Sequence, residues 1–154
     1  MPKFRRYGGY TAYSEGWGLY SEYIPKEMGL YEDPYSDFGR LSMELWRACR
    51  LVVDTGLHAR GWSREKATFY LTANTASNES ANLKAIERYM VMPGQATAYK
   101  IGMLKILELR EKARASLGDK FDIRAFHEVV LSNGAVPLNV LENLVNDWVA
   151  ATQD

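Results

Sequence analysis

The sequence is poor in cysteine and histidine, which limits the chemistry that the chain can carry alone. Its 154 residues include one cysteine and two histidines. The single cysteine, Cys49, excludes an intrachain disulfide and any metal site built from several cysteines. The two histidines, His58 and His127, lie far apart in the sequence, and neither belongs to a His-Glu-x-x-His motif. One carboxylate and one distant histidine do not complete a zinc site.

The sequence also lacks net charge and long apolar runs. Nineteen basic residues balance nineteen acidic ones, so no overall field attracts nucleic acid or an anionic membrane. No apolar run approaches the roughly 20 residues that span a bilayer. The basic residues near the start are followed by no apolar segment, so we expect no signal peptide in this chain. We therefore predict neither a nucleic-acid nor a membrane partner, and the cytoplasm is the default compartment for an otherwise unknown localisation.

No stretch shows the two-residue alternation of a β-strand, whereas apolar residues recur at helical spacing. We therefore predict an all-α fold. It consists of an irregular lead-in over residues 1–12 and a single domain of about seven helices over residues 13–152. The start and stop signals place these helices near residues 13–28, 34 or 37 to 54, 63–71, 79–90, 95–117, 122–133 and 137–152.

The segment from Tyr13 to Glu22 places two carboxylates, Glu15 and Glu22, among aromatic residues and glycines on the first predicted helix. Burying a carboxylate beside Trp and Tyr costs free energy unless it binds a cation or pairs with Arg or Lys. Gly16 and Gly18 each weaken a helix by about 1 kcal/mol, so together they predict the close approach of another backbone or a ligand. We interpret Glu15 as a metal ligand in a partial site. The alternative is that both glutamates are exposed or ion-paired on an amphipathic helix.

A histidine follows the second predicted helix, which we expect to end at Gly56. His58 then lies in a loop held between Gly56 and Gly61. Catalytic groups often occupy such loops, although a structural or solvated histidine is the alternative. We expect His127, which follows Phe126 on a later helix, to be a packing residue. The second helix itself carries a continuous apolar stripe, formed by Phe38, Leu41, Leu45, Ala48 and Val52.

A third segment runs from Arg88-Tyr89 through Pro93-Gly94-Gln95 to Tyr99. Tyrosine hydroxyls and an arginine beside the start of a helix could donate hydrogen bonds to a developing oxyanion. The alternative is a corner between two helices with a tyrosine in the core.

Four stretches together resemble a known bacterial family. They read EGWGLYSEYIPKEMGLYEDPYSDFGRL, RLVVDTGLHARGWSREKA, RYMVMPGQATAYKIG and LGDKFDIRAFHEVVLSNGAVPLNVLE. In this order they resemble the C-terminal part of the family catalogued as domain of unknown function number 885, over residues 6–148. Members of that family are similar to helical zincin-like metallopeptidases of the gluzincin type and are several times longer than this chain. Their upstream part carries a His-Glu…His motif, and the glutamate of the EGW motif is the third zinc ligand.

The resemblance implies a role for each matching residue. Glu15 would be a zinc ligand, and His58 would face the substrate. Tyr89 or Tyr99 would stabilise the tetrahedral intermediate of peptide hydrolysis. The weaker implications are substrate contacts for two further residues, Arg88 and Gln95. Zinc with three protein ligands and an open water position lowers the pKa of that water to about 7.

The chain departs from the family because it has no His-Glu zinc motif. We therefore expect zinc and a peptide substrate in full-length relatives, but no bound zinc and no peptide hydrolysis by this chain without the missing N-terminal catalytic half. Loss of that partner would expose the Tyr/Trp face of the first helix, which predicts a homo-oligomer. The alternative function is a non-catalytic helical module for binding a peptide or small ligand, or for assembly.

Overall fold

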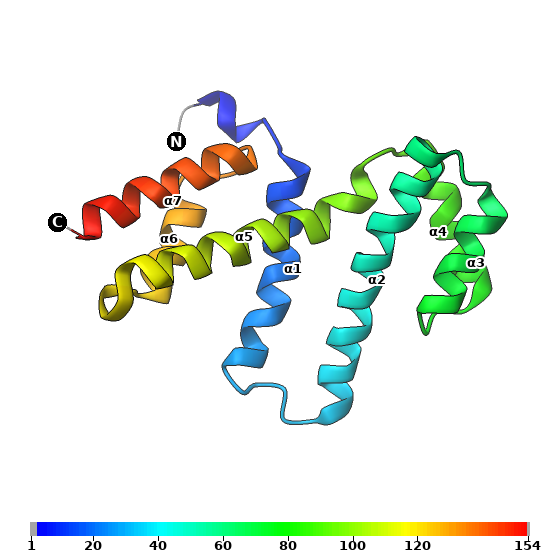
Figure 1. The fold of residues 1–154 in the computed structure, drawn as a ribbon, viewed down its shortest axis with the longest axis horizontal. Helices are drawn as coiled ribbons and strands as arrows, with labels where there is room; N and C mark the ends of the chain where they lie inside the picture. The colour runs from blue at the N-terminus through cyan, green and yellow to red at the C-terminus, as the bar shows by residue number, and fades with distance from the viewer. Residues whose placement is uncertain (1–2, 154) are drawn as a thin grey trace.

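Helices make up nearly all of residues 3–153, the part of the chain that this computed structural model describes (Figure 1). No β-strand occurs in these residues, so the predicted all-α class is confirmed. Seven α-helices are present in the described range: α1 Thr11–Glu27, α2 Pro34–Arg60, α3 Arg64–Asn74, α4 Glu79–Val91, α5 Gln95–Leu117, α6 Ile123–Ser132 and α7 Leu138–Gln153. Two short 3-10 helices accompany them, η1 Lys3–Arg6 and η2 Gly118–Lys120.

The long helix α5 crosses α1 near the middle of the molecule (Figure 1). Gly16 of α1 faces Gly102 of α5, and a Cβ atom added to Gly16 would lie 2.4 Å from the Gly102 Cα atom. The two backbones therefore touch at this crossing, as the glycines of the first helix predict for Gly16. Gly18 is different, because nothing lies within 4 Å of its Cβ position.

Two apolar cores lie along α5. The larger core joins α1, α5, α6 and α7 around Tyr20, Ile106 and Phe126. The smaller core joins α2, α3, α4 and the start of α5, and includes Leu71 and Ile86. The first turn of α5 therefore lies where the two cores meet, within reach of both α1 and α2.

Most helix boundaries follow the capping residues of the sequence. The side chains of Ser63, Asn78 and Asp122 accept hydrogen bonds from the first turns of α3, α4 and α6. Gly29 and Gly118, at φ +72° and +53°, follow the ends of α1 and α5. Helix α1 begins at Thr11, two residues before the predicted start.

The predicted end of the second helix at Gly56 is wrong. Helix α2 continues to Arg60 and ends at Gly61, which has φ +60°. Gly56 lies within the helix, and its lack of a side chain makes room for the indole of Trp62, since a Cβ atom there would be 2.5 Å from that ring. His58 therefore lies in the last turn of α2 and not in a loop.

The exposed apolar surface lies on α2 and not on α1. Tyr20 of α1 is fully buried and Trp17 packs against the larger core, so the Tyr/Trp face of the first helix is largely covered within this chain. The apolar stripe of the second helix is instead open to solvent, with exposed fractions of 63% for Phe38, 50% for Leu41, 49% for Leu45 and 37% for Val52.

Candidate functional site

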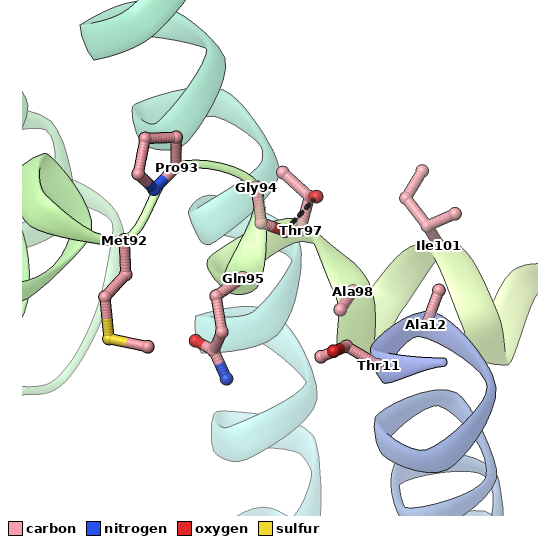
Figure 2. A pocket seen from close by; sticks show the side chains of 9 residues that line it. All are labelled: Thr11, Ala12, Met92, Pro93, Gly94, Gln95, Thr97, Ala98 and Ile101. Atoms are coloured by element: carbon pink, nitrogen blue, oxygen red, sulfur yellow. Dashed lines mark hydrogen bonds between the residues drawn. The ribbon is translucent and has the colours of Figure 1, made fainter. Parts of the chain in front are cut away.

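Three helices contribute polar side chains to one cluster at the start of α5. Gln95 Nε2 donates a hydrogen bond to Glu15 Oε1 of α1 at 3.4 Å. Gln95 Oε1 accepts one from Arg50 Nη2 of α2 at 3.0 Å. Figure 2 shows the Gln95 side chain extending away from the first turn of α5. A glutamate and an arginine that are distant in sequence are thus linked through one glutamine.

The turn before α5 is held by a buried carboxylate of α2. The backbone N–H of Gly94 donates to both carboxylate oxygens of Asp54, at 3.2 Å each. Gly94 has φ +80°, a conformation that favours glycine. Asp54 is buried, so it fixes the position from which Gln95 reaches Glu15 and Arg50.

Two arginines of α2 stack on tyrosine rings beside this cluster. The guanidinium of Arg50 lies 4.5 Å from the ring centre of Tyr99 and 5.0 Å from that of Tyr89. Arg47 lies 4.6 Å from the ring centre of Tyr99. These distances are those of cation–π contacts. Burial lowers the pKa of Arg50, and the charge of Arg47 acts in the same direction. We refer to Arg47, Arg50, Tyr89 and Tyr99 as the arginine–tyrosine cluster.

The structure brings four of the six predicted site residues together. Glu15 and Gln95 bond to each other, and both predicted tyrosines contact Arg50. His58 is exposed, and its Nε2 atom shares a hydrogen bond with the backbone oxygen of Tyr89 at 2.9 Å. The sixth residue, Arg88, is exposed on α4. Within residues 3–153, no hydrogen bond or ion pair joins His58 or Arg88 to Glu15.

Sequence reasoning missed three polar residues of α2 in this site, the buried Arg50 and Asp54 and the partly buried Arg47. Their spacing of three and four residues places them along one face of a helix. The sequence did contain a signal for these residues. It places two arginines on one face of a helix that also carries an apolar stripe. This face was assigned no role from the sequence, whereas Arg50 and Asp54 are buried in the structure.

The donor atoms of the described residues do not complete a zinc site. Glu15 is partly buried and brings one carboxylate to the cluster. In residues 3–153, no group of three or more His, Cys, Asp or Glu side chains is placed to share a metal ion. A catalytic zinc ion needs three protein ligands, and among residues 3–153 Glu15 is the predicted metal ligand in this cluster.

A pocket of about 490 Å³ opens beside Gln95, between the first turns of α1 and α5 (Figure 2). Its lining is mixed, with polar groups from Thr11, Gln95 and Thr97 and apolar side chains from Met92 and Ile101. Neither helix has an acidic residue or a side-chain cap in its first turn. The first N–H groups of a helix have no intrahelical partner, so this pocket suits the oxygen atoms of a ligand.

The second histidine belongs to a packed polar network on the other side of α1. His127 Nε2 lies 2.9 Å from the hydroxyl of Tyr20, and the Trp17 ring meets the His127 ring edge-on. Arg110 donates to the Tyr20 hydroxyl and binds both carboxylate oxygens of Glu27. Burial lowers the pKa of His127, and the nearby charge of Arg110 adds to this effect. The expectation that His127 is a packing residue is confirmed.

The geometry can be compared with known proteins. The sequence model of the family described as "Bacterial protein of unknown function (DUF885)" matches residues 1–145. A crystal structure described as that of the putative lipoprotein from Colwellia psychrerythraea matches with a TM-score of 0.93 and 57% sequence identity. The alignment covers 96% of this chain and 25% of that chain, so the present chain spans about a quarter of the length of that structure. No curated protein matches this chain.

The default expectation of a cytoplasmic protein is contradicted by this match. A lipoprotein is exported or anchored at a membrane, and the matching structure is described as one. The expectation failed because it was drawn from the lack of a signal within these residues, and such a lack gives no information on compartment. Among the described residues, no helix is long and apolar enough to cross a membrane.

Proposed function

The chain belongs to the bacterial DUF885 family, and from this premise we propose that it is the C-terminal part of a zinc-dependent peptidase. The observation that carries the proposal is the hydrogen bond between Glu15 and Gln95. These residues come from the EGW and PGQ segments, 80 positions apart. Helix crossing brings the two segments to one site, beside two tyrosines and a pocket large enough for a short peptide.

In this proposal Glu15 is one of three zinc ligands, and the other two come from outside these 154 residues. The metal would lower the pKa of a bound water to about 7 for attack on a peptide carbonyl. The residues of this chain orient the groups around that step. Before substrate binds, Gln95 holds the Glu15 carboxylate in place, and the Tyr99 phenol is the candidate donor to the developing oxyanion. His58 positions Tyr89 through its backbone carbonyl and makes no contact with Glu15.

The proposal extends to the substrate and compartment of the longer protein. Its substrate would be a peptide, and it would act outside the cytoplasm, in keeping with the description of the similar structure as a lipoprotein. The isolated chain is expected neither to retain zinc nor to cleave peptides, because it supplies one ligand where three are needed.

The test compares two glutamates of α1 in the longer protein. Glu15→Gln is expected to reduce bound zinc to a small fraction and to lower kcat/KM for peptide cleavage at least about 100-fold, because a metal ligand is lost. Glu22→Gln is the matched control, since Glu22 lies on the same helix and is exposed. Bound metal is measured by elemental mass spectrometry and cleavage by mass spectrometry of a peptide library. Unchanged zinc content and activity in Glu15→Gln would refute the proposal.

A second candidate function, assembly without catalysis, is favoured by the exposed stripe of α2. Phe38, Leu41 and Leu45 form an apolar surface along one side of that helix, and exposed apolar patches of this kind mark interaction sites. The predicted homo-oligomer would bury this stripe, in place of the largely covered face of α1.

A further inference from the structure

Arg50 is a buried cation that lacks a carboxylate partner within residues 3–153. Its exposed fraction is 7%, its Nη2 atom donates to the neutral amide of Gln95, and its Nε atom has no hydrogen-bond partner. The Nε atom of Arg47 is likewise buried and unpartnered. A buried charge without a counter-ion is costly, so the arginine pair needs an explanation beyond packing.

The other well-covered arginines of this fold are paired with carboxylates. Arg40, on the same helix, donates to Asp37 and to Glu44, each at 2.9 Å. Arg110 of α5 forms two hydrogen bonds with Glu27, at 2.6 and 3.0 Å. The fold therefore supplies acidic partners elsewhere, and their lack at Arg50 is specific to this site.

The carboxylates nearest to the arginine pair already have partners. Asp54 accepts two hydrogen bonds from the Gly94 N–H, and Glu44 accepts from Lys100 and Arg40. Glu15 accepts from Gln95 and, under the proposed function, carries the metal. None of these carboxylates forms an ion pair with Arg47 or Arg50 in residues 3–153, so the two guanidinium groups remain open to the anion of a ligand.

We propose that Arg50, supported by Arg47, binds the C-terminal carboxylate of a peptide ligand in the place now taken by Gln95 Oε1. A carboxylate presents two oxygens to the guanidinium fork and is a stronger partner than a neutral amide. Gln95 lines the pocket (Figure 2) and Arg50 lies behind its amide, so in this proposal a ligand in the pocket displaces the Gln95 amide from both Arg50 and Glu15. This assignment rests on the proposed function for the identity of the ligand as a peptide.

The short path from Arg50 through Gln95 to Glu15 defines the class of substrate. Gln95 contacts both Arg50 and Glu15, so a single side chain separates the carboxylate site from the proposed metal ligand. A peptide held by its C-terminal carboxylate at Arg50 would place a bond close to that end next to Glu15. The enzyme would then remove residues from the C-terminal ends of peptides and would reject peptides whose terminus is blocked.

The test measures binding of matched tripeptides to the longer protein by isothermal titration calorimetry, with a free C-terminal carboxylate or a C-terminal amide. The free acid is expected to bind at least about 30-fold more tightly, because truncating one partner of a buried charge pair weakens binding by this factor or more. Arg50→Lys and Arg47→Gln should reduce this preference, and Arg47→Gln serves if Arg50→Lys does not fold. The control is Arg114→Gln, since Arg114 lies far along α5 and its side chain is half-exposed.

Equal binding of acid and amide would overturn the inference. So would a preference that survives both arginine substitutions. If Arg50→Lys destabilises the longer protein but leaves peptide selectivity intact, the anion comes from that polypeptide and the inference is also wrong. Binding does not depend on turnover, so selective binding without cleavage of either peptide would refute the proposed hydrolysis and leave the carboxylate site standing.

Discussion

The substitution Gly16→Ala tests whether the close contact between α1 and α5 holds the site together. The added Cβ atom would lie 2.4 Å from Gly102 Cα, 2.5 Å from Gly102 C and 2.9 Å from Met103 N. These are backbone atoms, which cannot rotate away as a side chain can. Ordinary contact begins at 3.4 Å, so the helices must separate by about 1 Å to accept the methyl group.

The expected magnitude follows from two opposing effects. Alanine favours a helix over glycine by about 1 kcal/mol. Overpacking costs about 1–3 kcal/mol, and contact with three backbone atoms places this case near the upper end. The net loss in the free energy of unfolding is therefore about 2 kcal/mol, which corresponds to a fall in Tm of about 4–8 °C for a domain of this size.

Gly18→Ala is the matched control because Gly18 lies on the same helix with nothing within 4 Å of its Cβ position. It should gain about 0.5–1 kcal/mol from helix propensity alone. Both variants are compared with the wild type by urea and thermal denaturation followed by circular dichroism. Separation of the helices in Gly16→Ala should also break the 3.4 Å contact between Gln95 and Glu15. If Gly16→Ala is as stable as Gly18→Ala, the backbone contact does not constrain the crossing and this reasoning fails.

Two further predictions concern pH and association. Burial and the charge of Arg110 lower the pKa of His127 in the folded chain, against a smaller opposing effect of Glu27. In the unfolded chain, His127 takes up a proton near the ordinary histidine pKa of about 6.5. In the folded chain, His127 takes up this proton only at a lower pH. The free energy of unfolding should therefore fall as the pH drops below about 6.5, and urea denaturation of His127→Gln should show a flatter dependence. On the apolar stripe, Phe38→Ser with Leu45→Ser should reduce self-association of the isolated chain in sedimentation velocity and leave Tm nearly unchanged, because both side chains are half-exposed or more. A wild-type chain that stays monomeric at high concentration would contradict the second prediction.

Local signals were sufficient for most of the helices. Ser63, Asn78 and Asp122 cap α3, α4 and α6 beside the predicted starts of these helices, because a side-chain oxygen next to free N–H groups acts over a few residues. The end of α2 could not be found in this way. Gly56 and Gly61 both look like stop signals in the sequence. The structure shows different roles for them: Gly61 adopts the left-handed conformation that ends the helix, and Gly56 leaves room for the Trp62 ring.

The candidate site was predictable only in part. Glu15, Gln95 and Tyr99 lie in segments that resemble the family motifs, and the structure places them near one another. Arg50 contacts Gln95 and Tyr99 because α2 packs beside α5, and Gln95 contacts Glu15 because α1 crosses α5. Residue spacing within one helix does not predict how separate helices pack. His58 was predicted to lie in a loop because glycines flank it. It lies instead in the exposed last turn of α2, and its Nε2 atom contacts the backbone oxygen of Tyr89.

The orientation of α2 could not be predicted from the sequence, for a physical reason that also bears on function. Periodicity identifies an apolar face and a charged face, but it does not say which of them points into this chain. Arg50 and Asp54 of α2 are buried, whereas the apolar residues Phe38, Leu41 and Leu45 are exposed. The first half of α2 therefore gains little from the hydrophobic effect, whereas its second half buries Cys49 and Val53 in the smaller core. Under the proposed function, in which this chain is part of a longer protein, the rest of that protein would cover the stripe; under the alternative of assembly, a second copy would. Either partner would make α2 an interior helix, with the arginine–tyrosine cluster on one side and an apolar contact on the other.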